Sequence, residues 1–267
     1  MFQEGLLKGR AGIVTGGGSG IGLAMVKQLQ RYGARITITG RKEETLAAAA
    51  ESVGPGVTIS SGDVRSSEDI ARNLAEHLEN HDSVDFLINN AAGNFLCPLE
   101  KMSENAFSAV LDIVTKGTFL WSKAVQPHMK EKGYGRILNI GTTYSWAHAA
   151  WVAHSGAAKA AVLNLTRSMA VEWGPQGIMT NLIAPGAVSG TEGFRRLNPS
   201  TGGKLEMGCL PVARVADPSE IANMAVYLLS PMGDHINGAA IPIDAGAHLG
   251  VPGLLPVGIS ISPELLR

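Results

Sequence analysis

The first apolar run of the chain leads straight into glycines, in the stretch AGIVTGGGSGIG of residues 11–22. The run is typical of a buried strand, and the residues from 20 onward have helical periodicity, so the glycines stand between a strand and a helix. Glycine tolerates a positive φ and lets backbone N–H groups approach a pyrophosphate, which the positive end of the helix dipole stabilises. This turn therefore predicts a dinucleotide site, and a turn needed only for close packing is the alternative. The expected contacts are Gly16, Gly18, Ser19, Gly20 and Ile21.

Short apolar runs and helix-length amphipathic segments alternate along the rest of the chain. The expected strands are 11–15, 35–39, 57–60, 84–89, 135–141, 178–183 and 239–243. The expected helices are 20–32, 42–52, 67–80, 103–131, 152–173 and 218–229. Such alternation predicts a parallel sheet with helices on both faces. We therefore expect an α/β fold, a doubly wound Rossmann-like domain of about seven parallel strands.

Residues 1–267 contain no linker and no change of composition, so we interpret them as a single domain. The helix at 218–229 has a defined start, because Asp217 is a favoured N-cap and Glu220 completes a capping box. Residues 187–212 have no firm secondary-structure assignment. We interpret this segment as a lid over a substrate site, and a plain surface excursion is the alternative.

The end of the second expected strand distinguishes between the two nicotinamide dinucleotides. Sites of this kind usually place an acidic residue there, which binds the adenosine 2′-hydroxyl of NAD. Here the strand is followed by Gly40-Arg41-Lys42, so two cations stand where the carboxylate is missing. Arginine pairs with a 2′-phosphate in a bidentate manner, which favours NADP(H). The alternative is that Arg41 and Lys42 only begin a solvated helix.

The composition excludes several classes of protein and site. Lys and Arg number 22 against 23 Asp and Glu, and no basic run is present, so a nucleic-acid partner is not expected. Hydrophobic residues make up 45% of the chain, which indicates a large core rather than disorder. The seven histidines are scattered without ligand spacing, so no metal site is expected. The two long uncharged stretches are too polar or too rich in proline to span a membrane.

Cysteine usage and the chain ends bear on the compartment. Cys97 and Cys209 allow at most one disulfide, which a domain of this size does not need, and Cys97 is expected to be a packed residue rather than a nucleophile. The first ten residues resemble neither a secretion signal nor a transit peptide, and the last three are not a peroxisomal address. We therefore expect a reducing compartment and a cytoplasmic protein.

Together with later motifs, the chain resembles the short-chain dehydrogenase/reductase family over roughly residues 8–247. The matching pieces are Thr15-Gly16-x-x-x-Gly20-Ile21-Gly22, Asp63-Val64, Asn89-Asn90-Ala91-Ala92-Gly93, Lys159 and Pro185-Gly186. The resemblance implies that Lys159 holds the nicotinamide ribose. It also implies cofactor contacts from Asp63, Val64, Asn90, Ala91, Pro185, Gly186, Val188 and Thr191.

The catalytic signature of that family, Tyr-x-x-x-Lys, is altered here. Ser155 stands four residues before Lys159, where the family has the tyrosine that protonates a carbonyl oxygen. Thr142 occupies the place of the family's catalytic serine, and Lys116 that of an asparagine. An aliphatic hydroxyl is a poorer proton donor than a phenol, whose pKa is about 10, so the reduction of ordinary ketones is disfavoured.

One branch of the family, the 2,4-dienoyl-CoA reductases, has its tyrosine just after the fifth strand, fifteen residues before the lysine. Tyr144 stands at that distance from Lys159. The branch is also similar at residues 89–95, 170–175 and 189–197, and the peroxisomal-type members are the most similar. The alternative is that Tyr144 is a wall residue with a satisfied hydroxyl.

In conjugate reduction the hydride enters at the far carbon of the diene, and negative charge spreads to the thioester oxygen, which needs hydrogen-bond donors. The resemblance implies Tyr144 and Lys116 for this task, Ser155 as a smaller donor, and a final proton delivered to carbon. It further implies substrate contacts from Arg41, Arg65, Asn94, Phe95 and Arg195. The alternative to substrate binding is that Arg65 only begins a solvated helix and that Arg195 lies in a solvated turn.

The sequence thus predicts an NADPH-dependent reductase of 2,4-dienoyl-CoA, or related enoyl-CoA, thioesters in unsaturated fatty-acid oxidation. One alternative is a carbonyl or 3-oxoacyl reductase that uses Tyr144 as its acid. Another is a nucleotide-binding protein that has lost catalysis and serves as a redox sensor or scaffold. By resemblance, the helices at 103–131 and 152–173 are expected to form a homodimer or homotetramer.

Overall fold

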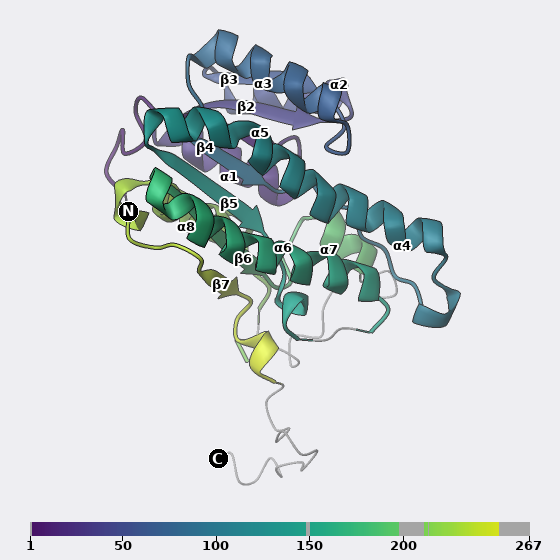
Figure 1. Cartoon of the computed structure of the whole chain (residues 1–267). Coiled ribbons are helices and arrows are strands. Elements are labelled where there is room, and N and C mark those ends of the chain that lie inside the picture. The colour runs from purple at the N-terminus through teal and green to yellow at the C-terminus, as the bar shows by residue number, and fades with distance from the viewer. Residues whose placement is uncertain (1, 148–149, 198–210, 213, 251–267) are drawn as a thin grey trace, which may run out of the picture.

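The computed structural model describes residues 2–147, 150–197, 211–212 and 214–250. Its centre is one parallel sheet of seven strands in the order β3-β2-β1-β4-β5-β6-β7 (Figure 1). The strands are β1 (Ala11–Thr15), β2 (Arg35–Gly40), β3 (Val57–Ser61), β4 (Phe86–Asn89), β5 (Gly135–Ile140), β6 (Ile178–Pro185) and β7 (Ala240–Ile243). The order reverses between β1 and β4, where the connection leaves one side of the sheet for the other. A sheet of this kind binds ligands at such a reversal, at the carboxyl ends of the strands.

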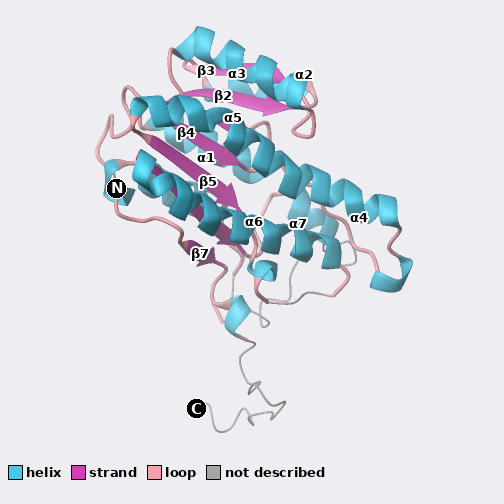
Figure 2. Cartoon of the chain, viewed as in Figure 1, coloured by secondary structure: helices cyan, strands magenta, loops and turns pink. Residues whose placement is uncertain are grey.

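Eight α-helices in the described residues surround the sheet (Figure 2). They are α1 (Gly20–Arg31), α2 (Glu43–Val53), α3 (Ser67–His81), α4 (Glu104–Leu111), α5 (Gly117–Lys132), α6 (Ala153–Trp173), α7 (Glu192–Leu197) and α8 (Pro218–Leu229). Helices α1, α2 and α8 share one apolar cluster with the sheet, while α3 and α5 share another. Every residue of the central strands β1 and β5 is buried, as expected for a sheet with helices on both faces.

The predicted fold class and the seven strands are confirmed, with strand ends that shift by at most two residues. The capping box of α8 is also present, because Asp217 accepts from backbone N–H groups and the Glu220 carboxylate accepts from the Asp217 backbone. Within the segment 187–212, helix α7 was not expected, and residues 198–210, which include Cys209, lie outside the described part of the chain.

The predicted helix over 103–131 is present as a continuous helical segment, Glu104 to Lys132. It contains a π-helical turn, Asp112–Lys116, between α4 and α5, which the sequence did not predict. The interruption coincides with close packing: the Thr115 hydroxyl donates to the Ala158 carbonyl of α6 over 3.1 Å, and a Cβ on Gly117 would lie 2.9 Å from the Val64 side chain. These contacts come from residues distant in sequence, so hydrophobic spacing did not reveal the π-helical turn.

Candidate active site

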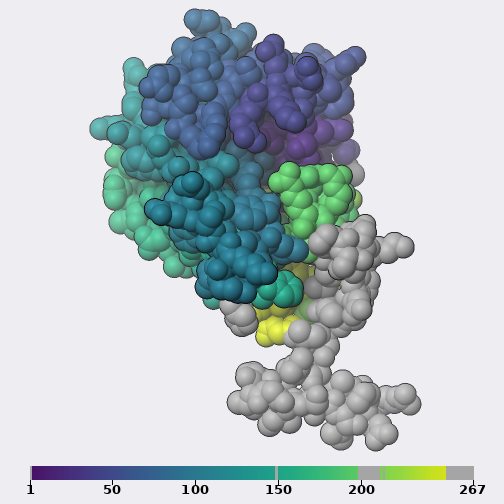
Figure 3. Space-filling view, turned by 90° about the vertical axis from the view of Figure 1, so that its right-hand side faces the viewer, coloured from purple at the N-terminus to yellow at the C-terminus, as the bar shows by residue number. Residues whose placement is uncertain are grey.

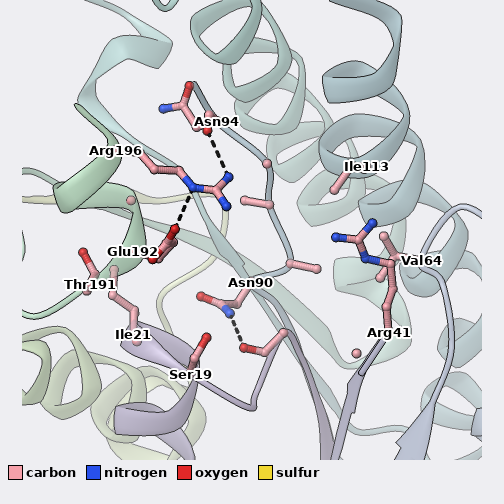
Figure 4. Close-up of a pocket in the computed structure, with 18 of the residues that line it drawn as sticks. Ser19, Ile21, Arg41, Val64, Asn90, Asn94, Ile113, Thr191, Glu192 and Arg196 are labelled. Carbon is pink, nitrogen blue, oxygen red and sulfur yellow. Dashed lines mark hydrogen bonds and ion pairs between the residues drawn. The ribbon is translucent and has the colours of Figure 1, made fainter. Parts of the chain in front are cut away.

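A pocket lies over the carboxyl ends of β1, β2 and β4, and its walls come from segments far apart in sequence (Figure 4). The glycine turn and the start of α1 form its floor, Arg41 lies at one end, and Arg196 of α7 lies at the other. In Figure 3 the green surface around α7 lies next to purple surface from the first part of the chain, in agreement with the approach of Thr191 to Gly20. Thr191 closes this side, since a Cβ on Gly20 would lie 3.7 Å from its methyl group.

The glycine turn has the geometry that a pyrophosphate site requires. Gly16 and Gly20 have φ values of +64° and +54°, which favour glycine. A Cβ on Gly22 would lie 2.3 Å from the Gly16 carbonyl oxygen, so a side chain there would displace the turn. The side chain of Ser19, the N-cap of α1, makes no capping hydrogen bond, and the first turn of α1 has no acidic residue. The positive end of α1 therefore faces the pocket without an internal anion.

The expected cofactor residues divide into those that line this pocket and those that do not. Gly16, Ser19, Gly20 and Ile21 line it, whereas Gly18 packs against Thr45 of α2. Of the later expected contacts, the following line the pocket as well: Asp63, Val64, Asn90, Ala91 and Thr191. The residues expected from the sequence thus meet in one place, from the turns after β1, β3 and β4 and from Thr191 just before α7.

At the end of β2, Arg41 and Lys42 have different positions. Both are exposed, but only Arg41 lines the pocket, while Lys42 is the N-cap of α2. Asp63 lies near Arg41 and binds Arg65, whose Nη2 is 2.6 Å from one carboxylate oxygen. The hydrogen bond from Arg65 and the nearby charges hold the pKa of Asp63 below its usual value. Arg65 is therefore engaged by Asp63, and Arg41 is the cation that lines this end of the pocket.

Asn90 ties the end of β4 to the glycine turn. Its side-chain nitrogen donates to the carbonyl oxygens of Thr15 and Gly16 over 3.0 and 3.1 Å. The Thr15 hydroxyl in turn accepts from the backbone N–H groups of Asn90 and Ala91, each over 3.0 Å. These four bonds fix the pocket floor, so Asn90 acts on the pocket by holding its backbone in place.

Lys159 is a buried cation at the carboxyl end of β5. Its ammonium group donates to the carbonyl oxygen of Ile140, the last residue of that strand. Burial lowers the pKa of Lys159 from 10.5 to about 8. The group is therefore mostly protonated at neutral pH, although a modest rise in pH would remove its charge.

Tyr144 lies beside the same helix. It belongs to a 3₁₀ turn, Thr143–Ser145, that directly follows the carboxyl end of β5 and packs on the first turn of α6. A Cβ on Gly156 would lie 3.5 Å from the Tyr144 carbonyl oxygen. Burial raises the pKa of Tyr144, so its phenol is a neutral hydrogen-bond donor at physiological pH. The turn of Tyr144 and the side chain of Lys159 thus both contact α6 or belong to it, and both lie near the carboxyl end of β5.

The other three expected catalytic residues differ in burial. Ser155 is buried one helical turn before Lys159 on α6. Thr142 begins the turn of Tyr144, and its carbonyl oxygen accepts from the backbone and hydroxyl of Ser145. Lys116 ends the π-helical turn and is exposed.

Phe95 and Asn94 lie on the loop after β4. Asn94 lines the pocket, and its carbonyl oxygen is 3.5 Å from Nη1 of Arg196. Phe95 stacks on His154 of α6, with ring centroids 4.3 Å apart. Both ring nitrogens of His154 are buried with no hydrogen-bond partner among the described residues. Cys97, on the same loop, is half-buried, and its thiol lies against the Pro98 carbonyl oxygen.

The loop after β6 carries the expected nicotinamide-end residues. Pro185 ends the strand, and Gly186 donates from its backbone to the Ile243 carbonyl oxygen of β7 over 2.9 Å. Val188 is buried, and its carbonyl oxygen accepts from the Thr191 hydroxyl. None of Pro185, Gly186 and Val188 lines the pocket described above; they lie deeper, toward β7.

Nine residues line the pocket without having been expected as contacts: Gly22, Gly40, Gly62, Ala92, Gly93, Ile113, Glu192, Gly193 and Arg196. Arg196 pairs with Glu192 over 2.8 Å, whereas Arg195, its expected neighbour, pairs with Glu192 from outside the pocket. Sequence alone could not choose between adjacent arginines, because that choice needs the rotation of α7, and Ile113 depends on the unexpected π-helical turn.

Two further observations bear on the class of protein. In the described ranges no group of three or more His, Cys, Asp or Glu residues could hold a metal ion. Among the helices that the structure describes, none combines the length and apolar character that a membrane crossing requires.

Comparison with known proteins identifies similar sequences over nearly the whole chain. A family model described as enoyl-(acyl carrier protein) reductase matches residues 16–248. The probable 2,4-dienoyl-CoA reductase [(2E)-enoyl-CoA-producing] of Bacillus subtilis is 42% identical, covering 90% of this chain and 97% of its own length. The peroxisomal 2,4-dienoyl-CoA reductase [(3E)-enoyl-CoA-producing] of Mus musculus is 39% identical, covering 94% and 88%.

Solved structures of dehydrogenases and reductases are also similar to this chain. A short chain dehydrogenase from Bacillus anthracis superposes with a TM-score of 0.83 at 40% identity, covering 91% of this chain and 98% of the other. A 3-ketoacyl-(acyl-carrier-protein) reductase from Brucella melitensis, complexed with NADH, superposes with a TM-score of 0.85 at 25% identity, covering 91% and 99%.

Proposed function

Because this chain belongs to the short-chain dehydrogenase/reductase family, an oxidoreductase family, we propose that it reduces 2,4-dienoyl-CoA thioesters with NADPH. The observation that carries the proposal is the placement of Tyr144. Its turn packs on the first turn of α6, the helix that carries Lys159, while Ser155 occupies the position from which family members usually donate a proton. Two relatives named as dienoyl-CoA reductases support the same substrate class.

The residues present fit a nicotinamide dinucleotide with a 2′-phosphate. The first turn of α1 is free of acidic residues, and Gly22 leaves the space that a Cβ would fill, so a pyrophosphate can approach the backbone. Arg41 lines the pocket at the end of β2 and would pair with the 2′-phosphate. Lys159 would hold the nicotinamide ribose, and the Pro185–Gly186 loop would border the nicotinamide. When bound, the cofactor supplies the hydride.

Tyr144 and Lys159 have complementary tasks in this proposal. Hydride addition to the far end of the diene leaves negative charge on the thioester oxygen, and the neutral Tyr144 phenol donates a hydrogen bond to that oxygen. Lys159 keeps the local field positive through its charge, and Ser155 and Lys116 are additional donors. The final proton goes to carbon, so the enzyme needs no strong acid in the position of Ser155.

Substrate binding is assigned to both ends of the pocket. Asn94 lines the end beside α7, and Phe95 would border the acyl chain. Arg41 and Arg65 at the other end, and Arg195 outside the pocket, are the cations proposed for the CoA phosphates. We propose that α7, with the remainder of 187–212, acts as a lid over this site. We also propose residues 1–267 as one domain and a cytoplasmic location.

A homodimer or homotetramer completes the proposal. Exposed apolar side chains on α5 and α6, Phe119 and Val171, support association through these helices.

An absorbance assay at the nicotinamide band tests the function directly. NADPH oxidation would be followed with a 2,4-dienoyl-CoA, a 2-enoyl-CoA and a panel of ketones, including a 3-oxoacyl thioester. The proposal expects the highest kcat/KM with the dienoyl-CoA. Preference for a ketone would support the carbonyl reductase, and no turnover with any substrate, despite cofactor binding, would support a nucleotide-binding protein without catalysis.

A further inference from the structure

A carboxylate and an imidazole form a rigid pair just after β7. The Asp244 side chain is almost fully buried and accepts from Nδ1 of His248 over 2.8 Å. It also accepts from the backbone N–H groups of His248 and Gly246, over 2.8 and 3.0 Å. Three donors on one carboxylate fix the orientation of the imidazole ring, as an outer carboxylate does for a metal-ligating histidine.

The fixed ring of His248 contacts the segment that carries Tyr144. Its centroid is 5.8 Å from that of Trp146, and the two ring planes meet at 89°, an edge-to-face contact. The backbone N–H of Trp146 donates to the Thr143 carbonyl oxygen over 3.3 Å, which closes the turn that contains Tyr144. The position of Trp146 is therefore linked to that of Tyr144 through one turn of backbone.

The same turn is supported from its other side by α6. A Cβ on Gly156 would lie 3.5 Å from the Tyr144 carbonyl oxygen and 3.9 Å from its Cβ, so the turn rests on this helix. Asp244 also contacts the loop after β6, since a Cβ on Gly186 would lie 2.6 Å from the Asp244 Cβ. Asp244 and His248 together thus contact the segments that follow β5 and β6, through Trp146 and Gly186.

We propose that His248, oriented by Asp244, is a positioning residue for Tyr144. The inference rests on the proposed function, because it takes Tyr144 as the donor to the thioester oxygen. His248 acts through Trp146: the ring contact limits movement of the 143–147 turn and keeps the phenol where the oxyanion develops. Small displacements of a catalytic donor reduce the rate strongly. A ring contact that holds the turn of Tyr144 in place therefore affects the rate, although it does not touch the substrate.

A double-mutant cycle separates this role from a general contribution to stability. His248→Ala is expected to lower the single-turnover rate of hydride transfer about two- to tenfold, the range that one aromatic edge contact represents, with little change in the Kd of NADPH. In a Tyr144→Phe background the same change should cost less than about twofold, because the hydroxyl that it positions is absent. Equal costs in both backgrounds would overturn the proposal.

Amide hydrogen exchange tests, without any substrate, whether the contact between His248 and Trp146 limits movement of the 143–147 turn. Exchange at residues 143–147 should be faster in His248→Ala than in the unmutated protein, whereas exchange in α8 should not change. His235→Ala, at an exposed histidine outside this cluster, is the matched control and should leave both segments unchanged. Unchanged exchange at 143–147 in His248→Ala would overturn the proposal, whether or not the protein reduces dienoyl-CoA.

Two further variants guard against a folding failure of His248→Ala. Trp146→Ala removes the other ring of the same contact from a half-exposed position and should reproduce the faster exchange. His248→Phe keeps a ring against Trp146 but loses the bond to Asp244, so its exchange should lie between those of the unmutated protein and Trp146→Ala. A His248→Phe protein with slower exchange than the unmutated one would contradict the role of Asp244.

Discussion

The ammonium group of Lys159 donates to the carbonyl oxygen of Ile140, and this bond joins helix α6 to the last residue of β5. The chain turns immediately after Ile140 into the segment that carries Tyr144. Strand β5 therefore sets the positions of both residues. The buried location also lowers the pKa of Lys159 to about 8, which makes its charge sensitive to mild alkali.

The affinity for NADPH is expected to weaken as pH rises through about 8 in the free protein, because Lys159 loses the charge that binds the ribose. Titrations of NADPH between pH 6.5 and about 9.5 would measure this. Lys159→Met should bind more weakly at low pH and lack the dependence. A Kd that stays constant across this range in the unmutated protein would contradict the assignment.

The contribution of Lys159 to protein stability should rise with pH, whereas the affinity for NADPH should fall. The pKa of Lys159 in the folded state, about 8, is lower than its usual 10.5, so between these values the unfolded chain binds more protons than the folded one. The free energy of unfolding contributed by Lys159 therefore rises with pH across this window. Urea denaturation at several pH values measures it, and subtraction of the Lys159→Met profile removes other titrating groups. Parallel profiles for the two proteins would refute the prediction.

Arg41→Asp is expected to invert the cofactor preference. A charge-assisted pair with the 2′-phosphate contributes about 1.5–3 kcal/mol, so the unmutated protein should bind NADPH about ten- to a hundredfold more tightly than NADH. Lys42→Asp is the matched comparison, since Lys42 is equally exposed but does not line the pocket, and its effect should be smaller. Equal affinity of the unmutated protein for both cofactors would rule out this role for Arg41.

Arg196→Ala is expected to raise KM for the acyl-CoA or the cofactor about fivefold to tenfold, because its guanidinium lines the pocket beside Asn94. Arg195→Ala removes a charge of the same kind from the adjacent position, where the side chain is 72% exposed and pairs with Glu192. Its effect should be less than about twofold. Steady-state kinetics with both variants checks this, and a larger effect from Arg195→Ala would favour the earlier expectation from the sequence.

The sequence predicted the sheet, the glycine turn and the capping box because each depends on local residue types. Gly16 and Gly20 need a positive φ, and Asp217 and Glu220 are three residues apart on one turn. The π-helical turn at 112–116 was not predictable in this way, since the segments it meets, around Val64 and Ala158, are distant in sequence. The same limit applies to Arg196 and to the contact between His248 and Trp146, which depend on how separate segments meet.

The most direct test of the central claim compares Tyr144→Phe with Ser155→Ala under single-turnover conditions, with NADPH and a 2,4-dienoyl-CoA. Tyr144→Phe keeps the ring but removes the hydroxyl that we propose as the donor to the developing oxyanion. The expected loss in the rate of hydride transfer is about 10²–10³-fold, as for other single oxyanion donors. Ser155→Ala should cost much less, because the proton goes to carbon. A Tyr144→Phe protein with the full rate, together with an inactive Ser155→Ala protein, would contradict the mechanism.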